Sequence, residues 1–509
     1  MGAFENSGAF PAALQPTQTK SLYSGNYLDF FNLPGGVSQW AQQFLPDVYE
    51  KEVERYGNRS ISSFLRMVSA EMPSTSDQII WTEQGRLHTR YVNCTPTTAP
   101  AVASGVQVGV VFTVAAAQPN VAGSQSYAGN IAAINFRVGQ TVMIQQQGTE
   151  ANKGGTGVVY KGIITAVSGL TFTASIYNPT PAIAMSTTTN YTALVYGSEF
   201  AKGTGNFQDK IDAEYSTFQN SPIILKEHYG LNGSDASQIG WIEVTSENGA
   251  SGYLWYMKSE HENRLRFEDY IEMSMVEGVR AGGSVTAPAT FNTGASFTAE
   301  TPVVRGTEGF FEALEARGHV YNGFGDEAAG GGALTDFDNI LRQLDRQGAI
   351  EENMIYLNRS LALEIDDILS QQNSYGAGGT SWGVFNNSED MALKLGFSGF
   401  RRGSYDFYKT DWKYLNDWST RGGFGDIEGV LIPAGTSTVY DQNLGKNIKR
   451  PFLHVRYRSS EADNRKMKSW ITGSVGGAYT TDIDEMRIHY LTERCLITQA
   501  ANNFVLFKA

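Results

Sequence analysis

A long stretch with almost no charged side chains constrains the fold of this chain more than any other feature. Between Thr95 and Tyr196, Val, Thr, Ala and Gly dominate. The strand-like runs are 105–114, 138–144, 162–167 and 170–176. Because β-branched residues alternate in these runs, the pattern favours strands over a disordered tract. Ser168-Gly169 between the last two runs is typical of a hairpin turn. The sequence predicts a compact all-β inserted domain of short strands, such as a small barrel.

Helical patterns follow this segment in the C-terminal half of the chain. Residues 253–279 carry mixed charge without proline, and a helix of that length would be about 40 Å long. The apolar positions of this helix are Leu254, Met257, Leu265, Tyr270, Ile271 and Met275.

A second predicted helix opens at Thr335. Asp338 follows three residues later, as in a capping box, and Gly348 stands where the helix should end. Its apolar positions are Phe337, Ile340, Leu341 and Leu344.

More strands follow that helix. Met354–Leu357 is a short apolar strand that precedes another helix to about Leu369. Further strands are expected near 404–410 and 429–432, and the segment from Arg450 to Ala509 is strand-rich. Helix, strand, helix and strands in this order describe an α+β domain.

The first 50 residues have little periodicity and contain exposed-type aromatics such as Phe30 and Phe31. They are expected to form an arm that gains order by packing on a neighbour. A short helix is expected between Asp47 and Met67, with Val48, Val53 and Phe64 among its apolar positions.

Composition limits the function classes. A length of 509 residues predicts more than one core. Cys94 and Cys495 are the only cysteines, so a disulfide framework is not expected. The sequence shows no signal peptide and no transmembrane segment, which predicts a soluble product made in the cytoplasm. A net charge of −13 without a basic run argues against a dedicated nucleic-acid binder.

Charged residues make up 18 % of the chain and aromatics 12 %. Ordinary soluble proteins have about 25 % charged residues. A surface covered by self-association would explain the difference, because interfaces are poor in charge and rich in aromatics. A loop-rich monomer fits composition equally well.

Motif tests predict no catalytic, cofactor-binding or metal residue. His261-Glu262 lacks the second His of a zinc-protease motif, since Leu265 occupies that position. Gly379-Thr-Ser381-Trp-Gly matches the sequence motif of a nucleophile elbow. Its structural context is missing, because a glycine-rich segment precedes it in place of a strand. Gly323-Phe-Gly resembles a dinucleotide loop, but Gly330-Gly-Gly follows in place of a helix.

Carboxylate pairs are interpreted as structural. Asp336 and Asp338 suit a helix start, where the dipole favours anions. Asp482 and Asp484 do not continue as a calcium-binding loop. The other histidines (His88, His228, His319, His454 and His489) are scattered singly and are interpreted as surface or satisfied residues.

Several stretches are similar to the major capsid proteins of tailed bacteriophages, which have the Hong Kong 97 fold. Glu260-His-Glu-Asn-Arg-Leu-Arg-Phe-Glu-Asp-Tyr-Ile-Glu-Met resembles their spine helix. Ala333-Leu-Thr-Asp-Phe-Asp-Asn-Ile-Leu and Met354-Ile-Tyr-Leu-Asn resemble the helix and strand of their axial domain. Gly429-Val-Leu-Ile-Pro-Ala-Gly and the ending from Thr492 to Phe504 are similar to late strands and turns of the family.

The resemblance implies an α+β fold with an N-terminal arm, an extended loop, a spine helix and an axial domain, plus the β insertion. The arm would be residues 1–50, the start of the peripheral domain and extended loop 51–94, and the all-β insertion 95–200. The return of the extended loop and the peripheral domain with its spine helix (about 253–279) would be 201–330. The axial domain would be 331–445, and the C-terminal strands that return to the axial and peripheral domains would be 446–509.

The same resemblance implies a non-enzymatic role without cofactors. Copies of the chain would form pentamers and hexamers of an icosahedral head that encloses double-stranded DNA non-specifically, assembled in the bacterial cytoplasm and located in the virion. Portal, scaffold and decoration proteins are further partners of such a shell, and no membrane contact is expected.

Three other functions stay open. The chain could be another virion component such as a tail protein. It could be a carbohydrate-binding appendage protein that works through residues 95–196 and exposes aromatic platforms. It could also be a hydrolase with dispersed carboxylates, which would require one pocket with perturbed carboxyl groups.

Overall fold

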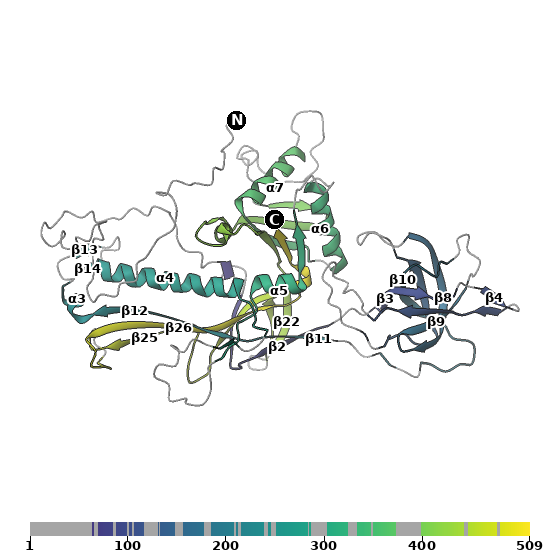
Figure 1. Ribbon diagram of the computed structural model, residues 1–509, viewed down its shortest axis with the longest axis horizontal. Helices are drawn as coiled ribbons and strands as arrows, with labels where there is room; N and C mark the ends of the chain where they lie inside the picture. The colour runs from purple at the N-terminus through teal and green to yellow at the C-terminus, as the bar shows by residue number, and fades with distance from the viewer. Residues whose placement is uncertain are drawn as a thin grey trace.

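The computed structural model describes most of the chain from Phe64 onward. The described residues are 64–65, 70–84, 88–98, 101–103, 106–116, 131, 133–147, 156–177, 185–207, 210–211, 215–238, 243–245, 251–282, 285–286, 303–323, 333–347, 350–372, 399–441, 446–475 and 479–509. Many strands and few helices make the chain a mixed α+β protein (Figure 1). The predicted arm at 1–50, and the predicted helix between Asp47 and Met67 apart from Phe64 and Leu65, lie outside these residues.

The first sheet has five strands and forms the elongated part of the body (Figure 1). Its central strand is β26 (Glu485–Thr498). β12 (Ile223–Asn232) pairs with β26 along one edge. β24 (Leu453–Arg458) and β25 (Lys468–Gly473) pair with its other edge, and β1 (Ala70–Ser74) joins β24 in parallel. One long strand therefore organises the whole sheet.

Helix α4 (Leu254–Glu277) lies along this sheet (Figure 1). Asn263, Phe267 and Ile271 recur every four residues on one side of the helix, and all three are buried. Phe267 and Ile271 pack with Tyr490 of β26. The helix was expected over about 253–279, and of its expected apolar positions Ile271 and Met275 are buried whereas Tyr270 is exposed.

The second sheet has six strands and lies at the other side of the body. Its order is β17 (His319–Asn322), β27 (Val505–Lys508), β21 (Ile427–Pro433), β18 (Glu352–Leu357), β20 (Tyr405–Asp411) and β19 (Gly399–Arg402). Helices α6 (Ala333–Gln347) and α7 (Arg359–Gln372) pack on one face through Phe337, Ile340, Leu361 and Ile365.

Both faces of the central strand β21 are buried. In β21, Val430 and Ile432 belong to the core shared with the first sheet, whereas Leu431 between them belongs to the core under α6 and α7. A strand buried on both faces appears in sequence as a continuous apolar run. The run from Gly429 to Ile432 is of that kind.

A two-stranded ribbon leads from the body toward a closed barrel. β2 (Ile79–Gln84) and β11 (Tyr215–Asn220) pair antiparallel, so residues 85–214 lie between the strands of one ribbon. The barrel has the order β10 (Tyr191–Ser198), β3 (Arg90–Pro96), β6 (Val110–Val114), β9 (Thr171–Ile176), β8 (Thr156–Ser168) and β7 (Gln140–Gln146). In Figure 1 it lies at one end of the long axis.

The barrel core follows from alternation along its strands. In β9, Phe172, Ala174 and Ile176 are buried, while the threonines and serine between them face outward. Phe112 of β6 stacks on Phe172, with ring centroids 5.0 Å apart. The barrel thus has a core of its own, which contains no residue from the two sheets of the body.

The remaining elements are short. Two-stranded ribbons are formed by β4 (Ala101–Ala103) with β5 (Val106–Val108), β13 (Glu243–Thr245) with β14 (Ser251–Tyr253), β15 (Val285–Thr286) with β16 (Val303–Val304), and β22 (Thr436–Asp441) with β23 (Lys446–Pro451). The short helices are α3 (Gly233–Gln238), α5 (Phe310–Arg317) and α9 (Lys413–Asn416), with 3-10 turns at Arg421–Gly423 and Ala501–Asn503.

The capping box predicted at Thr335 is wrong. Helix α6 begins at Ala333, so Thr335 already lies inside the helix, whereas a cap needs non-helical backbone. Ala333 and Leu334 are strong helix formers, and they extend the helix upstream. Asp338 instead accepts a hydrogen bond from Nε of Arg402 at 2.6 Å.

Two smaller differences concern the barrel. Ser168 pairs with Thr171, so the hairpin turn is Gly169-Leu170 and not Ser168-Gly169. Gly169 has φ of +56°, a conformation that glycine adopts without strain. The barrel strands begin at Arg90, five residues before the start predicted for the all-β insertion. The division into domains stays a prediction.

Candidate assembly surfaces

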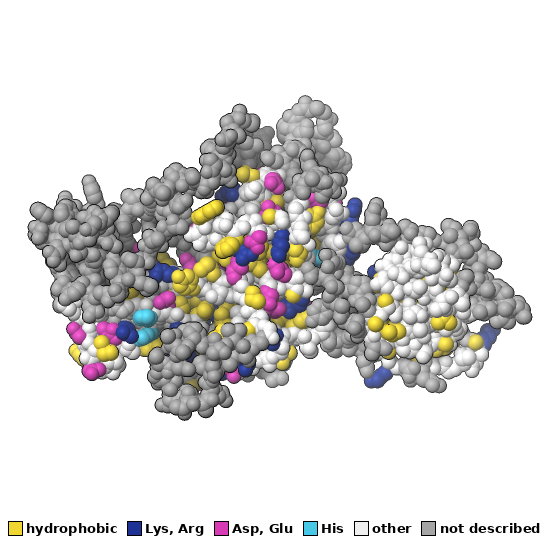
Figure 2. Space-filling model, viewed as in Figure 1, with side chains coloured by type: hydrophobic (Ala, Val, Ile, Leu, Met, Phe, Trp, Pro, Cys, Tyr) yellow, Lys and Arg dark blue, Asp and Glu magenta, His cyan; other side chains and the backbone are white. Residues whose placement is uncertain are grey.

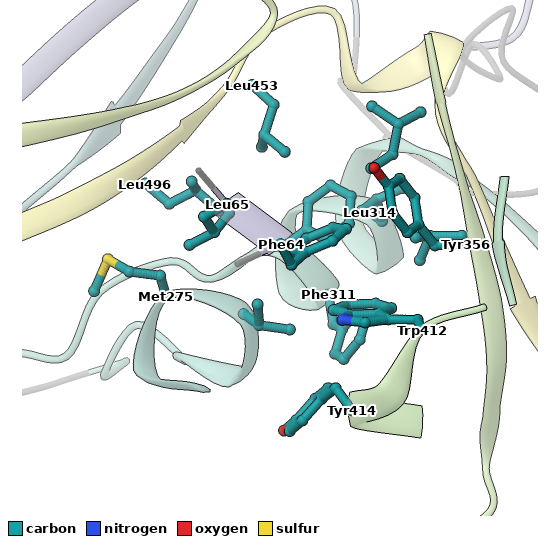
Figure 3. Close-up of a cluster of buried hydrophobic side chains, with 14 of the residues drawn as sticks. Phe64, Leu65, Met275, Phe311, Leu314, Tyr356, Trp412, Tyr414, Leu453 and Leu496 are labelled. Atoms are coloured by element: carbon teal, nitrogen blue, oxygen red, sulfur yellow. The ribbon is translucent and has the colours of Figure 1, made fainter. Parts of the chain in front are cut away.

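The first described residues, Phe64 and Leu65, are held against the two sheets by a buried aromatic contact. Phe64 stacks on Trp412, with ring centroids 4.1 Å apart, and meets Tyr356 edge-on at 4.9 Å (Figure 3). The backbone N–H of Leu65 donates to the buried Glu272 of α4 at 3.1 Å. Apolar packing and one hydrogen bond therefore fix the point at which residues 64–65 join the body.

The same core couples the two sheets. It includes Met275 of α4, Phe310 of α5, Val430 of β21 and Leu496 of β26. These side chains come from both sheets and from α4 and α5, and Figure 3 shows Met275 and Leu496 of this core near Leu65. Because close-packed cores resist shear, the angle between the sheets is set here.

A charged network closes this junction at the end of α4. Tyr414 donates to Glu277 at 2.7 Å, and Arg421 contacts both Glu277 and Asp426 at 2.7 Å. Burial raises the pKa of Glu277, although Tyr414 and Arg421 oppose that shift. The network holds the loop after α9 against the helix, and this loop exposes Trp418 and Phe424.

Asn220 ties three segments together at the base of the ribbon. Its side-chain amide donates to the carbonyls of Leu496 at 2.7 Å and Glu308 at 3.0 Å. Its side-chain oxygen accepts from the backbone N–H of Ser221 and of Glu308 and from the hydroxyl of Thr307. The residue is fully buried, and its bonds to Leu496 and Thr307 are buried with it.

Apolar side chains are exposed on several separate parts of the molecule. Tyr479 is 86 % exposed near the tip of the β25–β26 turn, and Phe424 is 78 % exposed on the loop after α9. On the barrel, Tyr177 and Tyr196 are about half exposed, and the Lys161 ammonium lies 6.0 Å from the Tyr196 ring. Figure 2 shows hydrophobic side chains over the central body and a mostly uncharged barrel surface.

The described residues show no constellation typical of an enzyme. They contain no group of three or more His, Cys, Asp or Glu that could hold a metal ion. His261 lies exposed on α4, and Asp482 and Asp484 are exposed near the β25–β26 turn. Asp336 lies in the first turn of α6, as the structural interpretation expected. Ser381 lies outside the described part of the chain.

Glu272, Met273, Val276, Trp412 and Tyr414 line a space that is too small to admit a water molecule. Ligand pockets usually measure about 300–1,000 Å³. Among the helices that the structure describes, none is both long and apolar enough to cross a bilayer.

Sequence patterns did not single out the residues that make these contacts. Phe64 was expected only as an apolar helix position, and Asn220 carried no signal because its partners are distant in sequence. His228 and His489 were interpreted as isolated, yet they face each other across two strands. Strand register, which the sequence did not provide, would have been needed to find that pair.

No protein-family model and no curated protein matches the chain. Solved structures similar to it include "Microbacterium phage Oxtober96", with 8 % identity over 92 % of this chain and 97 % of that chain, and a TM-score of 0.36. "Capsid of native GTA particle" gives 8 % identity over 92 % and 98 %, with a TM-score of 0.36. The mature capsid of bacteriophage PhiM1 gives 8 % identity over 62 % and 78 %, with a TM-score of 0.31. Phage capsid proteins are thus among the solved structures to which this chain is similar.

Proposed function

We propose that the chain is a structural subunit of a virus shell, the major capsid protein of a tailed bacteriophage with a Hong Kong 97-like fold. Copies of it would assemble into pentamers and hexamers of an icosahedral head that encloses double-stranded DNA. The subunit would be made in the host cytoplasm and reside in the virion, with portal, scaffold or decoration proteins as further partners. Its role is contact between subunits and not catalysis.

The observation that carries this proposal is the distribution of the cores. The body has one core between its two sheets and another under α6 and α7. The barrel, whose residues lie between β2 and β11 in the sequence, has a separate core. A globular enzyme gains little from carrying a folded unit on a ribbon. A shell subunit gains reach, because a projecting unit can contact neighbours that the body does not touch.

The surface supports the same conclusion. The exposed aromatics Phe424, Tyr479 and Tyr196 lie on the loop after α9, near the β25–β26 turn and on the barrel. A single binding site would gather such residues in one patch. Separate apolar positions fit several modest interfaces, as each copy in a lattice contacts neighbours on several sides.

The parts are assigned roles accordingly. Residues 1–50 would act as the arm, 51–94 would begin the peripheral domain and extended loop, and the barrel would be the insertion within that loop. The elongated sheet with α4 as spine helix would form the peripheral domain, and residues 331–445 the axial domain. The strands of 446–509 return to both, since β26 lies in the first sheet and β27 in the second.

Negative-stain microscopy of the purified full chain tests this proposal. Closed shells, ring-shaped capsomers or flat sheets would support it. Uniform small particles over a wide range of protein concentration and salt would overturn it, and tubes would indicate a tail component.

A deletion of residues 1–50 tests the role of the arm. The deleted protein should keep the thermal unfolding of the full chain but form no shells. Normal shells from the deleted protein would contradict the role of the arm, because nothing else in the experiment supplies residues 1–50.

A carbohydrate-binding role is the second candidate, and one observation favours it. Tyr177 and Tyr196 are exposed on the barrel near Lys161, and aromatic rings beside polar groups can stack on sugars. Calorimetric titration with oligosaccharides, compared between the wild type and Tyr196→Ala, tests it. Binding by a monomeric chain that Tyr196→Ala abolishes would favour this role over the shell.

A further inference from the structure

Three aromatic side chains lie at one level across the narrow end of the elongated sheet. His489 of β26 stands opposite His228 of β12 and opposite Trp470 of β25. The two imidazole rings lie 6.2 Å apart at 30°, and the indole of Trp470 lies 5.1 Å from His489 at 17°. The three rings therefore form a stacked ladder that links three strands.

The ladder lies on the face of the sheet opposite α4. Tyr490, the next residue along β26, points to the other face, where it packs with Phe267 and hydrogen-bonds Glu260 of α4. Alternation along a strand places His489 away from that helix. Figure 2 shows histidine beside basic side chains on this part of the surface.

Basic groups surround the ladder on its own face. By register and alternation, Lys226 of β12 and Lys468 of β25 are the diagonal neighbours of His489, and both are opposite Leu491. Diagonal neighbours in such ladders are about 7–8 Å apart. Arg487 precedes His489 by two residues on the same face of β26.

The acidic groups nearby are engaged elsewhere. Glu485 pairs with Arg487 at 2.7 Å, and Asp463 pairs with Lys468 at 2.8 Å. Glu227 of β12 accepts from the backbone N–H of His228 at 3.1 Å, at a position that alternation places toward the other face. Among the described residues, the carboxylate that acts on His489 is that of Glu485, which is also paired with Arg487.

This arrangement suits neutral rings and opposes charged ones. Nε2 of His489 lies 2.8 Å from the hydroxyl of Thr472, a bond that a neutral ring can make. Burial, the facing His228 and Arg487 together lower the pKa of His489, although Glu485 opposes that shift. Like charges directly opposite each other weaken an antiparallel strand pair.

We propose that His228, His489 and Trp470 form a proton-sensitive clasp, which holds β12 on β26 near neutral pH and loosens it on acidification. β12 is an outer strand of this sheet and follows the ribbon strand β11 directly in the chain. Loosening β12 therefore leaves Asn220 as the contact that holds the base of the segment that bears the barrel. The inference goes beyond the proposed function and holds whether or not the chain forms shells.

Hydrogen exchange of the full chain tests the clasp. Backbone amides of 223–232 are compared with those of β18 as an internal reference between pH 7.5 and 5.5, after correction for the intrinsic pH dependence of exchange. We expect the opening of β12, but not of β18, to increase by up to about fivefold at the lower pH, which is the size of one cross-strand pair interaction.

Variants separate the clasp from a general effect of acid. His228→Phe/His489→Phe keeps ring stacking without a titrating group and should abolish the pH step, and His228→Gln should reduce it. His88→Phe, which changes an exposed histidine outside the ladder, should leave the step unchanged. The clasp is refuted if wild-type β12 shows no step, or if the step persists in the double variant.

Discussion

The substitution Asn220→Ala tests whether the base of the ribbon is held by one buried side chain. It removes two donated and three accepted hydrogen bonds, which connect β11 with the segment before α5 and with β26. A buried polar group that loses its partner costs about 1–3 kcal/mol. Two of the five bonds are buried and three are partly buried, so water can recover some of the loss. We expect the body to lose about 3–5 kcal/mol of unfolding free energy, within the upper range of single substitutions.

The assay is chemical denaturation of unassembled protein. Tryptophan fluorescence monitors the unfolding of the body, and hydrogen exchange of the β9 amides monitors the unfolding of the barrel. Because the barrel has a separate core, its unfolding should not change. Asn206→Ala, at an exposed position, is the control. A loss below about 0.5 kcal/mol, as is usual for surface substitutions, would refute this account of Asn220.

Three further substitutions test other contacts. Gly162→Ala would place a Cβ 2.4 Å from the backbone oxygen of Ser175, so the barrel alone should lose about 1–3 kcal/mol, measured by exchange of β8 and β9. Asp366→Asn would leave Lys409 buried without its ion-pair partner and should cost about 3–5 kcal/mol in denaturation, whereas the double change Lys409→Met/Asp366→Leu should restore most of it. Burial lowers the pKa of His319, so the unfolded chain takes up that proton first as pH falls below about 6.5. Wild-type body stability should therefore fall on acidification, and an equal fall in His319→Phe would contradict this cause.

Local patterns in the sequence predicted the elements well where one residue spacing dominates. The helix expected over about 253–279 forms at 254–277, and the strand and helix expected around Met354 and Leu369 form as β18 and α7. These segments carry their burial pattern within themselves. Thr335 shows the limit of such patterns. The helix begins at Ala333 and not at the expected cap, because Ala333 and Leu334 are strong helix formers.

Contacts between distant segments could not be predicted in the same way. Asn220 hydrogen-bonds to Leu496, 276 residues away. The ring of Phe64 stacks on Trp412, which is more than 300 residues further along the chain. The histidine ladder needs the register of three strands at once. Motifs report chemistry at short spacing, whereas the surfaces proposed here are built by pairing, so the sequence alone left these residues as isolated positions.

The placement of β26 and β27 has a consequence for synthesis. Every other strand of the two sheets precedes residue 485, yet β26 is the central strand of the first sheet and β27 lies between β17 and β21 in the second. The barrel strands all lie between residues 90 and 198. On the ribosome, the barrel can therefore fold early, while both sheets wait for residues 485–508. Surfaces that depend on the complete body are therefore absent from the growing chain until its last 25 residues or so have left the ribosome.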